Sequence, residues 1–215
     1  MTPSDGPAFE VRLPERDVGA RTVLRTERAC LAIHRFGWPS GAWVYPEDPT
    51  AVKAEGMPWR PELVGRRFSD TPEGMAEFYR VVMAWAPPAP YALYVHRGVL
   101  YQLAPLTWVT PHAKAWNERA VALAVAGDFR RAPIPPEDWR ALVSGTAAVC
   151  QAFGWDPEER FGEAKLPRIA GHTELPGGTA DPEKSCPGAG LDLPRLRAAC
   201  RELLRRGEAL PVLRL

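Results

Sequence analysis

Several signals that would assign this chain to a class of protein are absent from its sequence. Its first residues, MTPSDGPAFEVRLPERD, do not show the basic and then apolar pattern of a secretory signal peptide. Nowhere do 18 or more apolar residues follow one another, so we expect no transmembrane helix. We therefore expect a protein that is cytoplasmic at synthesis.

An excess of charge is also missing. Lys and Arg number 27 against 26 Asp and Glu, which gives a formal net charge of +1. This balance argues against nucleic acid or an anionic membrane surface as the main partner. Hydrophobic residues make up 46% and charged residues 25%, a composition typical of a globular protein. The length of 215 residues favours one domain with a large insertion.

Cysteines are few, and none forms a CxxC pair. Cys30, Cys150 and Cys200 lie in apolar runs, where a buried thiol behaves as a small hydrophobic side chain. We therefore expect these three in the core. Cys186 is different, because Lys, Pro and Gly surround it in the segment GHTELPGGTADPEKSCPG, residues 171 to 188.

Alternating strand and helix patterns predict an α/β fold with a mixed central sheet flanked by helices on both faces. Strands are expected at 29–36, in a hairpin over 90–105, at 118–129 and at 166–172; helices are expected at 70–88, 134–155 and 191–206. His34 ends the first strand and should lie at a sheet edge. Tyr91 opens the hairpin, and His96 is interpreted as a turn residue beside Arg97 and Gly98.

The remaining parts of the chain show no sustained period. Residues 1–27 are predicted to be an N-terminal extension, and 28–215 to form the main domain. Residues 37–70 are dense in Pro, Gly and Trp, so they are predicted to be an irregular insertion in that domain. The tryptophans Trp38, Trp43 and Trp59 are expected to pin this insertion to the core rather than to stack on sugar rings.

Histidines gather where predicted strands end. His34, His112 and the loop with His172 and Cys186 all fall beside strand ends, and sites are commonly built at such rims. Catalytic zinc commonly takes three protein ligands and leaves the fourth position to water, which two histidines and one thiolate would satisfy. The HExxH motif is absent, and the residues alone leave open a zinc site or ordinary surface histidines.

Four segments together show a resemblance to a known family. LAIHRF, PYALYVHRGVLYQL, PHAKAWNERAVALAVAGDF and RIAGHTELPGGTADPEKSCPGAGLDLPRLR are similar to motifs of the zinc-dependent N-acetylmuramoyl-L-alanine amidases. That family includes phage amidase-type lysozymes and peptidoglycan recognition proteins. The resemblance covers about residues 28 to 206, and the motifs occur in the order that the family has.

The resemblance implies a metal site. In the family, a histidine after the first strand, a histidine in a GH motif and a downstream cysteine or aspartate bind zinc, which implies His34, His172 and Cys186 here. The loop between the last two is longer than in compact phage enzymes, so Asp181 is an alternative third ligand. We favour Cys186, because its KSCPG context matches the family at several positions together.

The resemblance also implies the other site residues. Tyr91 corresponds to a catalytic tyrosine and Lys184 to a catalytic lysine. Lys184 would stabilise the oxyanion, and Tyr91 would orient the water or assist proton transfer to the leaving amine, although the two roles are interchangeable. His112 and Asn117 match an HA…N motif that lines the substrate cleft in relatives.

The implied function is zinc-dependent hydrolysis of the amide between N-acetylmuramic acid and L-alanine, with peptidoglycan or muropeptide as the partner. We expect a monomer. The resemblance leaves two sites of action open: the cell wall, reached by lysis or by a dedicated export route, and the cell interior, where wall fragments are recycled. One alternative is a peptidoglycan-binding protein that has kept the fold and lost catalysis. Another is an unrelated cytosolic zinc hydrolase of small amides, to which intact cell wall would be inert.

Overall fold

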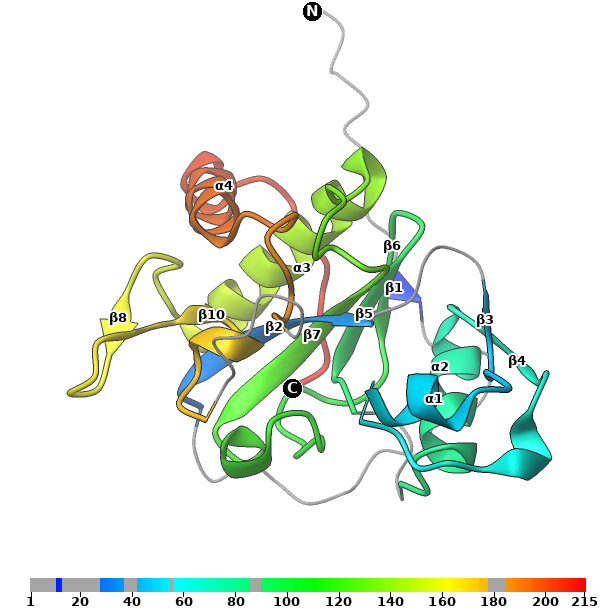
Figure 1. The fold of residues 1–215 in the computed structure, drawn as a ribbon. Coiled ribbons are helices and arrows are strands. Elements are labelled where there is room, and N and C mark those ends of the chain that lie inside the picture. Colours follow the sequence, from blue (N-terminus) through cyan, green and yellow to red (C-terminus); the bar gives the residue numbers. More distant parts are fainter. Residues whose placement is uncertain (1–10, 13–27, 37–41, 55, 86–89, 178–184) are drawn as a thin grey trace, which may run out of the picture.

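A six-stranded mixed sheet forms the centre of the molecule (Figure 1). The computed structural model describes residues 11–12, 28–36, 42–54, 56–85, 90–177 and 185–215. In spatial order the strands are β1 (Val11–Arg12), β6 (Val99–Gln102), β5 (Leu93–His96), β7 (Ala120–Ala126), β2 (Cys30–Phe36) and β10 (Ile169–Gly171). β5 and β6 are antiparallel, and the other neighbours are parallel. The predicted mixed sheet is therefore confirmed.

Two strand positions differ from the expectations. β2 lies between β7 and β10, so the placement of His34 at a sheet edge was wrong: its strand is second from the edge. The segment predicted as an N-terminal extension supplies β1, which pairs with β6 and joins the sheet. A pair of residues is too short to show a strand period in the sequence.

Two long helices cover one face of the sheet, and Figure 1 shows them lying together on that side. α3 (Pro136–Phe153) begins with two prolines and ends at Gly154, whose φ of 67° is the left-handed conformation that glycine adopts without strain. α4 (Leu193–Arg206) begins at Asp192, whose side chain accepts a hydrogen bond from the Arg195 N–H. Their apolar sides bury one face of β2, β5 and β7, together with Cys150 and Cys200.

A third helix, α2 (Pro72–Val81), packs on the opposite face, which confirms helices on both faces. Thr71 caps it by accepting a hydrogen bond from the Gly74 N–H. On this face β7 presents only the methyl groups of Ala122, Ala124 and Ala126. These small side chains leave space above the middle of the sheet for larger groups from the neighbouring strands.

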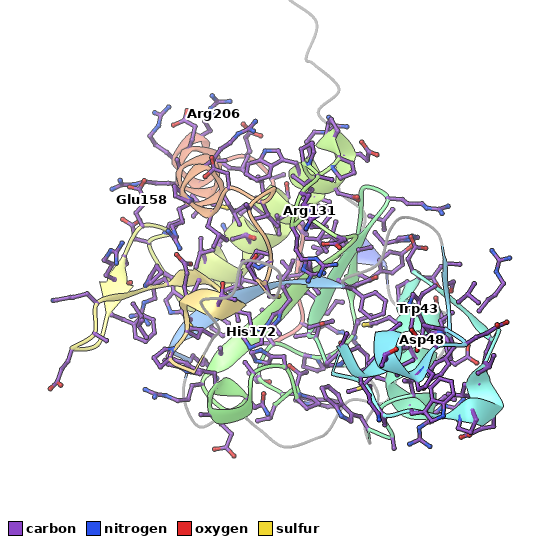
Figure 2. The ribbon with its side chains drawn as sticks, viewed as in Figure 1. Trp43, Asp48, Arg131, Glu158, His172 and Arg206 are labelled. Carbon is purple, nitrogen blue, oxygen red and sulfur yellow. The ribbon has the colours of Figure 1, made fainter. Side chains whose placement is uncertain are left out.

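The segment predicted to be an irregular insertion contains regular structure. β3 (Ala42–Val44) and β4 (Arg67–Ser69) form an antiparallel pair, with α1 (Pro49–Ala54) and the short 3-10 helix η1 (Pro61–Leu63) between them. Trp43 lies in this part of the molecule in Figure 2, with its ring 6.0 Å from Phe68 and 5.5 Å from Phe78. Strands of three residues are too short to show alternation, which is why the sequence did not reveal them. Trp43 and Trp59 pack against the α2 core, as expected, whereas Trp38 lies outside the described residues.

The predicted strand at 166–172 is two strands. β9 (Leu166–Pro167) pairs with β8 (Arg160–Phe161) in a separate small sheet, and β10 joins the main sheet. Arg168 lies between them and donates hydrogen bonds to the Glu159 carboxylate and to the Ala29 carbonyl. Two further 3-10 helices, η2 (Lys114–Trp116) and η3 (His172–Glu174), precede β7 and follow β10.

His96 is not the turn residue that was expected. It is the last residue of β5, and its Nε2 lies 3.1 Å from Oδ1 of Asp70, with both side chains 8% exposed. The turn itself is formed by Arg97 and Gly98, as predicted. None of the helices in the described ranges is long and apolar enough to cross a membrane.

Candidate metal centre

His34 stands at the centre of the α2 face of the sheet. It is the fifth residue of β2, pairs with Ala124 of β7, and is only 2% exposed. The methyl group of Ala124 leaves the neighbouring volume free for the imidazole ring. The strand thus places one buried imidazole on a floor of small side chains.

His172 reaches the same place from the neighbouring strand. Because Gly171, the last residue of β10, pairs with Ile33, His172 at the start of η3 lies beside His34, and the two imidazole centroids are 4.6 Å apart. Figure 2 labels His172 near the middle of the molecule, below β10. Gly171 has no room for a side chain, because a Cβ there would lie 2.9 Å from Cδ of Pro187. This glycine lets the segment with Cys186 approach the strand.

Cys186 completes the cluster. Its Sγ lies 3.7 Å from Nδ1 of His34. Its carbonyl accepts hydrogen bonds from the backbone N–H and the hydroxyl of Thr173, at 3.0 and 3.1 Å, which tie the segment to η3. One ligand atom from each of His34, His172 and Cys186 lies within 4.8 Å of the other two.

These distances fit a zinc ion. With bonds of about 2.05 Å to nitrogen and about 2.3 Å to sulfur, tetrahedral geometry separates the two atoms by about 3.6 Å. The separation of 3.7 Å between His34 Nδ1 and Cys186 Sγ agrees with this value. Two imidazoles and one sulfur also form a donor set that zinc prefers, with a fourth position left for water or substrate.

Arg35, a residue that the sequence did not single out, holds the cysteine in place. Its backbone N–H points to Cys186 Sγ at 3.5 Å, and its Nε donates to the Ser185 carbonyl at 3.2 Å. The guanidinium also pairs with Asp128 at 3.2 Å. Its position directly after a candidate ligand in a buried strand was the available signal, since charged residues are rarely buried without a partner.

The electrostatics of the site favour neutral ligands in the metal-free protein. Burial, followed by the charges of His112 and His172, holds the pKa of His34 well below its usual value. Burial also lowers the pKa of His172. For Cys186, burial raises the thiol pKa to about 11, although the Arg35 N–H and guanidinium oppose this shift. A bound cation would have to displace the thiol proton but would meet two imidazoles that are already neutral.

Tyr91 lies beside the cluster, two residues before β5 begins, so it precedes the strand rather than opening it. Its ring is 5.3 Å from that of His34, and its hydroxyl is 3.2 Å from the hydroxyl of Tyr79 in α2. Burial raises the pKa of Tyr91 well above 10 and that of Tyr79 to about 12, so both hydroxyls stay protonated and can donate. Tyr79 was missed because it falls among the apolar residues of an amphipathic helix.

His112 also touches the cluster, with Nδ1 3.1 Å from Nε2 of His34. Asn117 lies next to it and accepts a hydrogen bond from the His112 N–H at 2.8 Å. The predicted role of these two residues in lining a substrate cleft stays a prediction. Lys184 and Asp181 lie outside the described residues.

Fold and site together define an α/β domain with a His, His, Cys centre on one face of a mixed sheet. The family model of N-acetylmuramoyl-L-alanine amidase (Amidase_2) matches residues 73–189, more than half of the chain. This chain belongs to that family, whose members cleave or bind peptidoglycan. The matched range contains Tyr91, His172 and Cys186, whereas His34 precedes it.

Solved structures show the same fold. The Ph2119 endolysin of a Thermus scotoductus bacteriophage is 18% identical with a TM-score of 0.55, over 84% of this chain and 89% of that one. The endolysin amidase LysCS from Clostridium intestinale is 15% identical with a TM-score of 0.52, over 88% and 97%. The Drosophila peptidoglycan recognition protein PGRP-SA is 10% identical with a TM-score of 0.54, over 86% and 88%. A comparison with curated proteins found no match.

Proposed function

We propose that this protein is a zinc-dependent amidase that hydrolyses the amide between the lactyl group of N-acetylmuramic acid and L-alanine of peptidoglycan. The observation that carries the proposal is the convergence of His34, His172 and Cys186, with ligand atoms within 4.8 Å, in a chain of the amidase family. The protonated hydroxyl of Tyr91 beside this cluster adds to its support.

When bound, zinc would supply a Lewis acid for the amide carbonyl and a water whose pKa is lowered toward about 7. The imidazoles of His34 and His172 and the thiolate of Cys186 would hold the ion, and the single negative charge of the thiolate would leave the site with one net positive charge. Arg35 keeps the cysteine segment against the end of β2. Hydrolysis adds water across the C–N bond, so the sugar gains a carboxylate and L-alanine a free amino group.

The chain supplies the proton donors that such a reaction needs. Tyr91 keeps its Oη proton at neutral pH, so it can donate to a developing oxyanion or to the leaving amine. The hydroxyl of Tyr79 in α2 forms a hydrogen bond with the Tyr91 hydroxyl and so positions it. We propose Lys184 as the second donor, on the strength of its place two residues before Cys186 in the family motif.

The proposal is tested by incubating zinc-loaded protein with purified peptidoglycan and measuring new L-alanine amino termini. Wild type should release them, and Cys186→Ala should lose both zinc and activity. Cys200→Ala is the matched control, because Cys200 belongs to α4 and is buried in the core on the opposite face of the sheet from the cluster. Its zinc content and activity should stay at the wild-type level.

A peptidoglycan-binding protein without catalysis would give a different result. Zinc would bind and the protein would sediment with peptidoglycan, yet no amino termini would appear. That outcome would contradict the amidase proposal and leave the family membership intact.

A further inference from the structure

The rings of His34 and His112 are in direct hydrogen-bond contact. His34 Nε2 and His112 Nδ1 are 3.1 Å apart, and the two rings meet edge to face at 88°. The residues are 78 positions apart in the chain, one in β2 and the other in the turn before η2. This contact uses the nitrogen of His34 that points away from Cys186.

A single carbonyl group fixes which nitrogen of each ring carries hydrogen. His112 Nε2 lies 3.0 Å from the carbonyl oxygen of Ala120, the first residue of β7. A carbonyl oxygen can only accept, so Nε2 of His112 must carry the hydrogen. In a neutral imidazole Nδ1 is then an acceptor, and His34 must donate to it from Nε2. The bare lone pair of His34 is therefore on Nδ1, the atom 3.7 Å from Cys186 Sγ.

The backbone around His112 is held independently of the ring. The side-chain oxygen of Asn117 accepts hydrogen bonds from the backbone N–H groups of His112 and Ala113, at 2.8 and 2.7 Å. These two hydrogen bonds to Asn117 Oδ1 hold the backbone of the turn that carries the His112 imidazole. Both ring nitrogens of His112 are engaged within the protein, so neither remains for a hydrogen bond to a substrate.

We infer that His112 is a positioning residue for the metal ligand His34. The chain of hydrogen bonds from Ala120 O through His112 holds His34 in the tautomer that presents Nδ1 to a metal, and it fixes the plane of that ring. Metal-binding histidines generally donate their second N–H to an acceptor that fixes the tautomer and the ring orientation, and here Nδ1 of His112 is that acceptor. The inference rests on the proposed zinc site, and it replaces the substrate-lining role for His112 with one that acts through the metal ligand.

Two amide variants separate this role from simple packing. In His112→Asn the side-chain oxygen lies near the position of Nδ1, so it can still accept from His34 but cannot reach Ala120 O. In His112→Gln the side-chain nitrogen lies near the position of Nε2, so it can still donate to Ala120 O but cannot accept from His34. The inference predicts that His112→Gln weakens zinc binding by about 10- to 100-fold. His112→Asn should stay within about threefold of wild type, since the acceptor that fixes the tautomer is kept.

The readout is zinc affinity by competition with a chelating dye, with the visible spectrum of the cobalt-loaded protein as a measure of ligand geometry. His112→Gln should alter the cobalt spectrum, whereas His112→Asn should reproduce that of wild type. Equal affinities and equal spectra in the two variants would overturn the inference. Thermal melting of each metal-free variant shows whether it has folded.

A second measurement needs neither a variant nor zinc. Nitrogen-15 NMR of histidine-labelled, metal-free wild type reports which ring nitrogen of His34 carries hydrogen. The inference predicts hydrogen on Nε2 and a bare Nδ1; the reverse tautomer, or a mixture of the two, would overturn it. If the predicted tautomer is found but wild type binds no zinc, the proposed function fails and the hydrogen-bond arrangement stands.

Discussion

Zinc binding to this site should depend steeply on pH because of one thiol. Burial raises the pKa of Cys186 to about 11, so at pH 7 the metal-free protein carries a protonated thiol. Zinc binds the thiolate, and removing a proton four units below its pKa costs about 5 kcal/mol of binding free energy. The pKa values of His34 and His172 are lowered, so both rings are already neutral and contribute little to the slope.

The sign follows from the direction of the shift. A raised thiol pKa favours the protonated form, which cannot bind, so zinc affinity should rise with pH until about pH 11. Between pH 6.5 and 8.5 we expect about a tenfold gain for each unit, with one proton released from the thiol for each zinc bound.

The matched control is Cys186→Asp. An aspartate is already ionised in this pH range, with an ordinary pKa of about 3.9, so the variant should lack this proton. Any ionisation of the bound water is common to both proteins and cancels in the comparison. Calorimetric titration in two buffers of different ionisation enthalpy counts the protons. Equal proton release from wild type and Cys186→Asp would refute the reasoning.

Other substitutions test the site and the core. Tyr91→Phe should lower amidase activity by about 100-fold or more with zinc affinity unchanged, and an unchanged rate would exclude Tyr91 as a donor. Tyr79→Phe removes only a hydrogen bond to Tyr91, so it should lower the activity about fivefold, less than Tyr91→Phe does. A larger loss in Tyr79→Phe than in Tyr91→Phe would contradict the assignment of Tyr91 as the donor. Gly171→Ala places a Cβ 2.9 Å from Cδ of the rigid Pro187 ring, which should cost about 1–3 kcal/mol of unfolding free energy by chemical denaturation and weaken zinc binding. No change in either quantity would count against the close approach of the Cys186 segment. Leu123→Ala empties a fully buried position and should cost about 2–5 kcal/mol of unfolding free energy; a loss below about 1 kcal/mol would show that the core collapses around it.

The long, strongly patterned elements could be predicted from the sequence. α2, α3 and α4 have the expected helical spacing, proline marks their starts, and glycine marks the ends of α3 and α4. α2 ends at Val81, several residues before the predicted Pro-Pro stop. β2 and β7 are buried on both faces and appear as continuous apolar runs. The three candidate metal ligands His34, His172 and Cys186 were inferred from family motifs, and the structure brings their potential ligand atoms within 4.8 Å of one another.

Contacts between distant parts of the chain could not be predicted. The His34–His112 hydrogen bond joins residues 78 positions apart, and the Arg35–Ser185 bond joins residues 150 apart. Neither leaves a local pattern, because each depends on which strands become neighbours in the sheet. The prediction that His96 is a turn residue failed for the same reason, because its partner Asp70 lies in a distant part of the chain, just before α2.

Short elements escaped for a different reason. β3 and β4 have three residues each, and β1 has two, so no alternation can be read along them. β3 and β4 are stabilised by aromatic packing, such as that of Trp43 against Phe68, rather than by local propensity.

The central claim is that the protein cuts one particular amide, and the most direct test is to follow the oxygen that hydrolysis adds. A defined muropeptide is digested in water enriched in oxygen-18 (heavy oxygen), and the masses of the products are measured by mass spectrometry. The account predicts one heavy oxygen in the lactyl carboxylate of the sugar product and none in the released stem peptide. An uncleaved muropeptide, or heavy oxygen in a peptide carboxylate, would contradict it.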